Sequence, residues 1–275
     1  MQNPACQAGN LAVVTGGAAG IGLAAACRFG ALGMRVALLD LGAERLEAGA
    51  SAVRAAGAPE VTVHEVDVTD SAALEQAADG LGPVSVLMAN AGIQPGSSLF
   101  GPAEEWERVL DVNLGGVIRT VRAFVPGMIA AGRDGAVIVT GSKQGITTPP
   151  GDPAYNVSKS GVKTFTEALE HDLRNREGNR ITAHLLIPGF VYTDLTRKGR
   201  TEKPSGAWTP EQTAAFMMDS LERGDFYILC PDNDVDRALD EKRIAWAAGD
   251  IIENRPPLSR WHKDYAEAFA AFLKS

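Results

Sequence analysis

Short apolar segments alternate along the chain with longer segments in which apolar residues recur at helical spacing. The short segments are mostly continuous in their apolar character, which is typical of strands buried on both faces of a parallel sheet. We predict seven strands, at Leu11–Gly16, Arg35–Asp40, Val61–Val68, Val84–Asn90, Ala136–Ser142, Ile181–Pro188 and Phe226–Cys230. Helix-length segments between them include Ile21–Leu32, Ala43–Ala56 and Glu104–Ala130. This order predicts an α/β fold, a doubly wound parallel sheet with helices on both faces.

No change in composition and no linker divides the 275 residues, so we expect a single domain over residues 1–275. After Pro188 the regular alternation of strand-like and helix-like segments ends. The polar stretch Thr193–Ala207 is long for a connection, and we interpret residues 193–222 as a substrate lid. Residues 231–275 then form an atypical C-terminal extension.

Two helices are predicted in this C-terminal part. The sequence TPEQ places a capping Thr209, a Pro210 at the first helical position and a Gln212 that completes a capping box. In the last helix, residues Trp261, Tyr265, Ala268 and Phe272 fall at helical spacing, which indicates a packing stripe within or between subunits.

Composition narrows the class of protein. Of the residues, 45% are hydrophobic and 22% are charged, which suits a folded domain with a sizeable core. The net charge of −8 argues against a nucleic-acid partner. Three cysteines far apart and four histidines without ligand spacing argue against disulfides and a metal site. We see no signal peptide and no apolar run of membrane-spanning length, and we therefore expect a cytoplasmic protein.

A glycine-rich turn follows the first predicted strand and leads into a helix. In TGGAAGIG, residues Gly16, Gly20 and Gly22 have the spacing of a dinucleotide-binding turn. Gly16 permits the tight turn, Gly20 lets the backbone approach a pyrophosphate, and Gly22 lets the helix pack closely on the strand. The second strand ends at Asp40, whose carboxylate can accept the hydroxyls of an adenosine ribose and repel a 2′-phosphate.

No Arg or Lys stands at Ala18, Ala19 or Leu41, where it could neutralise such a phosphate. NAD is therefore favoured over NADP. The alternative is that Asp40 is an ordinary turn residue at the end of a strand.

A candidate catalytic pair stands in YNVSK. Tyr155 and Lys159 are four residues apart and share one face of a helix that Asp152 can cap and Pro153 can begin. A lysine ammonium near a phenol favours the phenolate, so we expect the pKa of Tyr155 to fall from about 10 toward neutrality. Such a tyrosine can exchange a proton with an alcohol or a carbonyl.

Two further polar residues join this pair. Ser142 ends a buried strand at the carboxyl edge of the sheet, where its hydroxyl could bind a substrate oxygen. Asn113 lies between Val109 and Val117 on an apolar helix face and needs hydrogen-bond partners, which backbone groups could supply. Gly115 and Gly116 follow it, which indicates a kink or close packing.

Together these motifs resemble the short-chain dehydrogenase/reductase (SDR) family, with matches from about Leu11 to Asp194. The resemblance adds Asp67 and Val68 at the adenine side, the NAG motif at Asn90, Ala91 and Gly92, and Pro188, Gly189, Val191 and Thr193 after a strand. It implies a Rossmann fold. The cofactor-binding residues it implies are Gly16, Ala19, Gly20, Ile21, Gly22, Asp40, Leu41, Asp67, Val68, Asn90, Ala91, Gly92, Tyr155, Lys159, Pro188, Gly189, Val191 and Thr193.

The resemblance also implies a mechanism. Tyr155 acts as general acid or base, Lys159 lowers its pKa and binds the nicotinamide ribose, Ser142 polarises the substrate oxygen, and Asn113 holds a water in a proton relay. The implied activity is NAD-dependent interconversion of a secondary alcohol and a ketone by hydride transfer. A catalytically silent NAD-sensing or scaffold protein is the alternative, although such a protein would be expected to lack the Ser, Tyr or Lys. A sugar-nucleotide epimerase or dehydratase would have a differently spaced glycine motif.

The resemblance ends at the C-terminus. Many family members carry a glycine-ending segment where this chain reads FYILCPDNDVD, which leaves the familiar tetramer in doubt and a homodimer through Glu104–Ala130 and Pro153–Arg176 plausible. We expect a homo-oligomer, a dimer or a tetramer. Position alone suggests the substrate residues Gln94, Ser142, Gln144, Phe190, Tyr192 and Trp208, and their partly aromatic character favours a bulky or aromatic alcohol. An anionic substrate could be attracted by Lys143, Arg197, Lys198 and Arg200, although solvated loop charges are the favoured alternative.

Overall fold

In the computed structural model, which describes residues 3–274, the seven strands form one sheet whose pairs are all parallel. The strands are β1 (Leu11–Thr15), β2 (Arg35–Asp40), β3 (Val61–Glu65), β4 (Val86–Ala89), β5 (Gly135–Thr140), β6 (Ile181–Ile187) and β7 (Tyr227–Leu229). Their order in the sheet is β3-β2-β1-β4-β5-β6-β7. The order reverses between β1 and β4, and this switch point is where open α/β sheets bind ligands.

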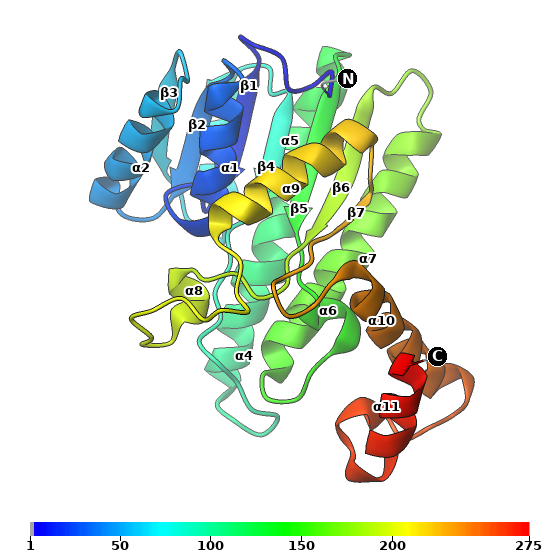
Figure 1. Cartoon of the computed structure of the whole chain (residues 1–275). Coiled ribbons are helices and arrows are strands. Elements are labelled where there is room, and N and C mark those ends of the chain that lie inside the picture. Colours follow the sequence, from blue (N-terminus) through cyan, green and yellow to red (C-terminus); the bar gives the residue numbers. More distant parts are fainter. Residues whose placement is uncertain (1–2, 275) are drawn as a thin grey trace.

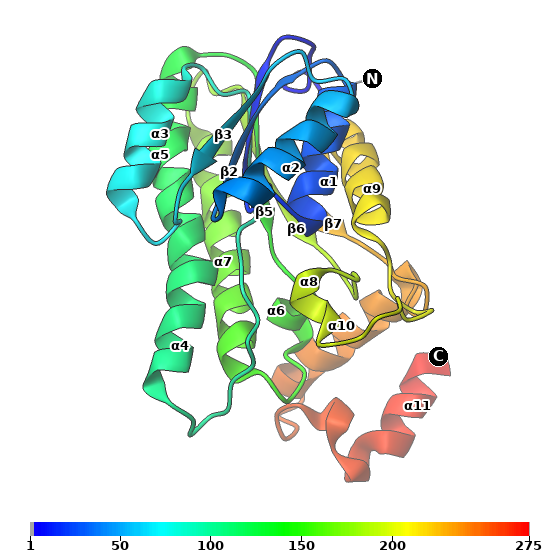
Figure 2. The same cartoon turned by 90° about the vertical axis from the view of Figure 1, so that its left-hand side faces the viewer.

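Helices cover both faces of the sheet (Figures 1 and 2). One face carries α1 (Gly20–Ala31), α2 (Ala43–Ala55) and α9 (Pro210–Arg223). The other carries α3 (Ser71–Leu81), α5 (Gly116–Ala131) and α7 (Pro153–Asn175). The predicted doubly wound fold is confirmed.

Each face of the sheet has its own apolar core, which explains the continuous apolar strands. Val14 and Leu38 pack with α1 and α2, whereas their chain neighbours Val13 and Leu39 pack with α3 and α5 on the opposite face. All seven predicted strands are present. The predicted strand at Val61–Val68 is shorter in the structure because its sheet pairing with β2 ends at Glu65, although Val66 and Val68 stay buried.

A continuous helical segment runs from α4 (Ala103–Leu110) through a π-helical turn η1 (Asp111–Gly115) into α5. The distortion predicted from Gly115 and Gly116 is thus confirmed. A Cβ atom added to Gly116 would lie 2.6 Å from Val68 Cγ2, so the turn also brings the helix close to the segment after β3.

The same segment corrects the expectation about membrane spans. Ala103–Ala131 is long and apolar enough, by length and composition, to cross a membrane. On its core-facing side, Val117, Val121 and Phe124 are buried against the sheet and α3. A helix that covers the middle of a large sheet needs such an apolar face.

Beyond β6 the chain forms a short helix α8 (Asp194–Arg197), then α9, β7, α10 (Arg237–Ile252) and α11 (Ala266–Lys274). The predicted capping box at Thr209 is confirmed, with Gln212 N–H donating to Thr209 Oγ1 at 3.3 Å. The predicted final helix is only partly right. Trp261 and Tyr265 lie in separate 3₁₀ turns before α11, while Phe272 of that helix packs on Trp246 of α10. The lid, the role of the extension and the single domain stay predictions.

Candidate active site

The glycine-rich turn joins β1 to α1 at the switch point of the sheet. Gly16 has a φ of +63°, which a residue with a side chain rarely adopts. A Cβ atom on Gly22 would lie 2.2 Å from the Gly16 carbonyl oxygen. The two glycines therefore let the turn close directly onto the first turn of the helix.

The start of α1 offers backbone N–H groups rather than a capped end. Its N-cap residue is Ala19, whose methyl group cannot accept a hydrogen bond, and its first turn carries no acidic residue. Free N–H groups and the positive end of the helix dipole suit a pyrophosphate. Gly20 faces Thr193, because a Cβ atom there would lie 3.3 Å from Thr193 Cγ2. Two predicted cofactor segments thus meet across this turn.

Asn90 holds the glycine turn in place from the end of β4. Its side-chain amide donates to the carbonyl oxygens of Thr15 and Gly16, each at 3.2 Å, and its carbonyl accepts from Thr140 Oγ1 at 3.0 Å. Ala91 lies directly against Gly16. The sheet-stabilising role that the resemblance implies for this motif has a matching geometry here.

The other predicted cofactor residues lie along the same carboxyl edge. Asp67 is exposed and accepts hydrogen bonds from Thr69, whereas Val68 is buried. Pro188 accepts the backbone N–H of Lys143 at 3.2 Å. Val191 is buried and bridges to Trp208.

Asp40 is more engaged than its position suggested. Its carboxylate accepts the N–H groups of Ala18 at 3.0 Å and Leu41 at 2.8 Å, and it forms an ion pair with Arg45 at 2.7 Å. Arg45 lies in the first turn of α2 and half of its side chain is exposed. The cation beside Asp40 was not predicted, because it stands at Arg45 and not at Ala18, Ala19 or Leu41. A basic residue in the first turn of the following helix is the signal that could have found it.

Tyr155, Ser142 and Lys159 meet at the carboxyl end of β5. Tyr155 hydrogen-bonds Ser142, and both Tyr155 and Lys159 are buried. The Lys159 ammonium donates to the Thr140 carbonyl at 2.8 Å and lies 5.8 Å from the centre of the Tyr155 ring. The predicted helix face therefore exists, on α7.

The expected fall in the tyrosine pKa is wrong for this arrangement. Burial raises the pKa of Tyr155 to about 12, because desolvation outweighs the hydrogen bond from Ser142, and Asp152 raises it further. Burial also lowers the pKa of Lys159 to about 8. The lysine donates to a backbone carbonyl rather than to the phenol, so spacing alone overstated its effect on the tyrosine.

Asn113 is fully buried in the π-helical turn and binds the chain after β4. Its Oδ1 accepts the Ile93 N–H at 2.7 Å, and its Nδ2 donates to the Ile93 carbonyl at 2.9 Å and to Ser158 Oγ at 3.3 Å. The backbone bonding considered for this residue is present. The π-helical turn directs the amide toward the sheet edge.

The start of α7 corrects another detail. Asp152 is the N-cap residue, but its side chain makes no cap bond. It accepts instead from Gln94 Nε2 at 3.2 Å and Ser97 Oγ at 2.6 Å, while Ser97 Oγ accepts the Ala154 N–H at 3.0 Å. A serine 57 residues away thus caps α7, a contact that no local pattern in the sequence indicates.

The remaining substrate candidates are dispersed. Tyr192 donates its hydroxyl to the Arg200 carbonyl at 2.9 Å, and Trp208 packs on Phe216 against the core. The Phe190 ring lies 5.9 Å from the Arg200 guanidinium. Gln144 donates its backbone N–H to Ser142 Oγ at 3.1 Å and lines a cavity of about 230 Å³.

Comparison with known proteins identifies the family. The sequence profile described as short chain dehydrogenase matches residues 10–204. The 1-deoxy-11-beta-hydroxypentalenate dehydrogenase of Streptomyces avermitilis is 31% identical over 86% of this chain and 89% of its own.

Two solved structures with a bound dinucleotide superpose on this chain. A short chain dehydrogenase/reductase from Burkholderia phymatum in complex with NAD has a TM-score of 0.82 at 30% identity, covering 94% of this chain and 98% of that one. An alcohol dehydrogenase from the archaeon Thermococcus sibiricus complexed with 5-hydroxy-NADP has a TM-score of 0.69 at 28% identity, covering 78% and 90%. With the match over residues 10–204 and the parallel seven-stranded sheet, the chain belongs to the short-chain dehydrogenase family, oxidoreductases that act on alcohols and ketones with NAD or NADP.

Proposed function

We propose that this protein is an NAD-dependent oxidoreductase that interconverts a secondary alcohol and a ketone. The observation that carries the proposal is the group formed by the buried Tyr155 and Lys159 and the half-buried Ser142, at the sheet edge that the glycine turn also borders. When bound, the nicotinamide dinucleotide supplies the hydride acceptor or donor. A bulky or aromatic substrate remains our preference from the aromatic residues Phe190 and Tyr192.

In ketone reduction, Tyr155 donates the proton to the carbonyl oxygen, while Ser142 holds that oxygen by a hydrogen bond. The raised pKa of Tyr155 keeps the phenol protonated at neutral pH, as a proton donor requires. In alcohol oxidation Tyr155 takes the proton, so oxidation should accelerate at higher pH. Lys159 binds the nicotinamide ribose, and Asn113 anchors the segment after β4 and can hold a water of the proton relay.

Specificity for NAD rests on Asp40. Its carboxylate closes the end of β2 beside the glycine turn, where it accepts ribose hydroxyls and repels a 2′-phosphate. Two backbone N–H groups and Arg45 fix its orientation.

The experiment is a panel of secondary alcohols and ketones, followed by the absorbance of the reduced nicotinamide with NAD and with NADP. Tyr155→Phe should lower kcat by about 10²- to 10⁴-fold without weakening NAD binding. Tyr227→Phe is the matched control, because that hydroxyl bonds to Glu167 at the amino end of β7. Cofactor binding without turnover of any compound, or full activity in Tyr155→Phe, would contradict the proposal.

A further inference from the structure

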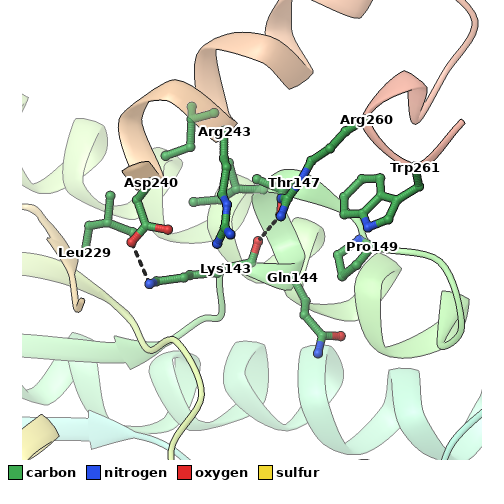
Figure 3. A pocket seen from close by; sticks show the side chains of 11 residues that line it. Lys143, Gln144, Thr147, Pro149, Leu229, Asp240, Arg243, Arg260 and Trp261 are labelled. Carbon is green, nitrogen blue, oxygen red and sulfur yellow. Dashed lines mark hydrogen bonds and ion pairs between the residues drawn. The ribbon is translucent and has the colours of Figure 1, made fainter. Parts of the chain in front are cut away.

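A cavity of about 230 Å³ lies between the segment 143–149, which follows Ser142, and the C-terminal extension (Figure 3). Gln144 and Thr147 of the short helix α6 (Gln144–Thr147), together with Pro149 after it, line one side of the cavity. Arg243 of α10 and Arg260 of the 3₁₀ turn η2 (Ser259–Trp261) line it from the extension. The segment that exceeds the family profile therefore forms one wall of a cavity beside the catalytic serine.

Two guanidinium groups point into this cavity. Figure 3 shows the ends of Arg243 and Arg260 converging above the segment that contains Gln144 and Thr147. Arg260 is held in place by stacking on Trp261, with 4.7 Å between the guanidinium carbon and the ring centre, and on Phe269 at 5.4 Å. Arg243 Nε is buried and has no hydrogen-bond partner among residues 3–274.

The carboxylates of Asp232 and Asp240, near the two arginines, form their ion pairs with Lys143. Lys143 Nζ forms ion pairs with Asp240 Oδ2 at 2.5 Å and with Asp232 Oδ2 at 3.5 Å. Asp240 attracts both Arg243 and Arg260 electrostatically, but within the described part of the chain neither arginine reaches a carboxylate at ion-pair distance. Three cations thus face two carboxylates, and the surplus positive charge belongs to the arginines.

Both arginines are partly buried and repel each other, which favours a counter-charge in the cavity. Burial and the neighbouring Arg243 lower the pKa of Arg260 to about 10. Cations removed from water are normally paired or hydrogen-bonded in folded proteins. Guanidinium groups in particular match the geometry of a carboxylate, a sulfonate or a phosphate.

We propose that this cavity binds an oxyanionic group through Arg243 and Arg260, and that the group is the remote end of the substrate. The second half of this inference rests on the proposed function. Gln144 connects the two sites, because it lines the cavity while its backbone N–H binds Ser142 Oγ. The substrate class is then an alcohol or ketone that carries a carboxylate, sulfonate or phosphate several bonds from the reacting carbon.

The first experiment measures anion binding without catalysis. Inorganic phosphate and inorganic sulfate are titrated into the full-length protein, and tryptophan fluorescence reports on Trp261 beside Arg260. Arg243→Gln and Arg260→Gln should each weaken binding at least tenfold, and Arg243→Lys, which keeps the charge, should weaken it less. Arg237→Gln is the matched control, because that exposed arginine of α10 pairs with Glu241. Retained NAD binding shows that each variant is folded.

The second experiment compares hydroxycarboxylic acids that carry a secondary alcohol, over a series of chain lengths, with their neutral methyl esters. At one chain length the acid should have a kcat/KM at least tenfold above its ester, and Arg243→Gln should abolish that preference mainly through KM. Suppose instead that each acid and its ester have the same kcat/KM at every chain length while Arg243→Gln weakens phosphate binding. That result would overturn only the claim that the bound anion is the remote end of the substrate. Phosphate and sulfate binding that the variants leave unchanged would overturn the whole inference. Absence of turnover for acids and esters alike, together with no turnover in the alcohol and ketone panel, would instead refute the proposed function, and the phosphate titration would still decide the anion site.

Discussion

Around the glycine turn, the groups that face the predicted cofactor are mainly backbone amides, with one carboxylate at Asp40. Beside Ser142, the cavity is lined by side chains from segments far apart, such as Gln144 and Arg243. We call the first region, residues 15–22 with Asp40 and Asn90, the cofactor side. We call the second, residues 94–97, 143–152 and the extension from α10, the substrate side.

The difference follows from what each side must recognise. A dinucleotide presents the same phosphates to every member of a family, so backbone geometry fixed by the fold is sufficient. Substrates differ, and long-range contacts such as Ser97 to Asp152 or Lys143 to Asp232 can change without disturbing the sheet. Substitutions that add atoms close to the backbone should therefore affect the cofactor side most. Substitutions that change side-chain charge should affect the substrate side most.

The largest effect should come from Gly22→Ala on the cofactor side. The added Cβ atom would lie 2.2 Å from the Gly16 carbonyl oxygen and 2.7 Å from Asn90 Nδ2, so the turn must open. We expect a loss of about 3 kcal/mol in unfolding free energy and about 100-fold weaker NAD binding. Urea denaturation and cofactor titration measure the two.

The matched control is Gly80→Ala in α3, where a Cβ atom would have no neighbour within 4 Å among the described residues. It should stabilise the protein by about 0.5–1 kcal/mol. If both variants had the same unfolding free energy and NAD affinity, the close packing at Gly22 would not be needed for the cofactor side.

Next in size is Asp40→Ala, which tests the one side chain that dominates the cofactor side. The ratio of kcat/KM for NAD to that for NADP should fall about 10- to 100-fold, because the variant neither binds the ribose hydroxyls nor repels a 2′-phosphate. Released from its ion pair, Arg45 becomes available to a phosphate. Adding Arg45→Gln to Asp40→Ala should lower the kcat/KM for NADP again. If Asp40→Ala left the ratio unchanged, Asp40 would be only a turn residue.

A third effect concerns Lys159, which stands between the two sides. Its pKa is about 8 in the folded chain against an ordinary 10.5, so below pH 8 both states are charged and the folded state bears the full desolvation cost. As the pH rises from 8 toward 10.5 that cost disappears, and the contribution of Lys159 to stability increases. Between pH 7.5 and 9.5 the wild type should gain about 2 kcal/mol relative to Lys159→Met.

Urea unfolding of both proteins without cofactor measures this difference. The window ends below pH 10, where the raised pKa of Tyr155 would start to lower stability. Cys6 and Cys230, whose pKa values burial also raises, affect both proteins alike. A constant difference across the window would show that Lys159 titrates normally in the folded chain.

The contrast between the sides also explains what the sequence predicted. Strands such as Ile181–Ile187 were predicted because burial on both faces leaves an uninterrupted apolar run. The glycine turn and the pair Tyr155 and Lys159 were predicted because their spacing is local. The roles of Ser97 and Arg243 were not, since each depends on a contact between segments that only the folded chain brings together.

Spacing also predicted proximity better than it predicted chemistry. Tyr155 and Lys159 do share a helix face, yet the direction of the tyrosine pKa was wrong, because burial and the Thr140 carbonyl are not visible in the sequence. The cation beside Asp40 was missed for a related reason. Arg45 lies in the next helix, and its side chain folds back onto the strand end.

The smallest predicted effect tests the long-range contacts themselves. Ser97→Ala removes the hydroxyl that caps α7 at Ala154 and donates to the buried Asp152, and it should lower the unfolding free energy by about 1 kcal/mol. Thr209→Ala removes a local cap from α9 and should lower it by a similar amount. Activity separates the two variants.

Ser97→Ala frees the segment that contains Gln94, so KM for an alcohol substrate should rise severalfold, whereas Thr209→Ala should leave KM unchanged. Steady-state kinetics with one responsive substrate, alongside urea denaturation, gives both quantities. If the two variants had the same KM, the contact between Ser97 and Asp152 would stabilise the catalytic helix without shaping the substrate side. The long-range contacts would then be structural, and specificity would have to reside in the charges of the cavity alone.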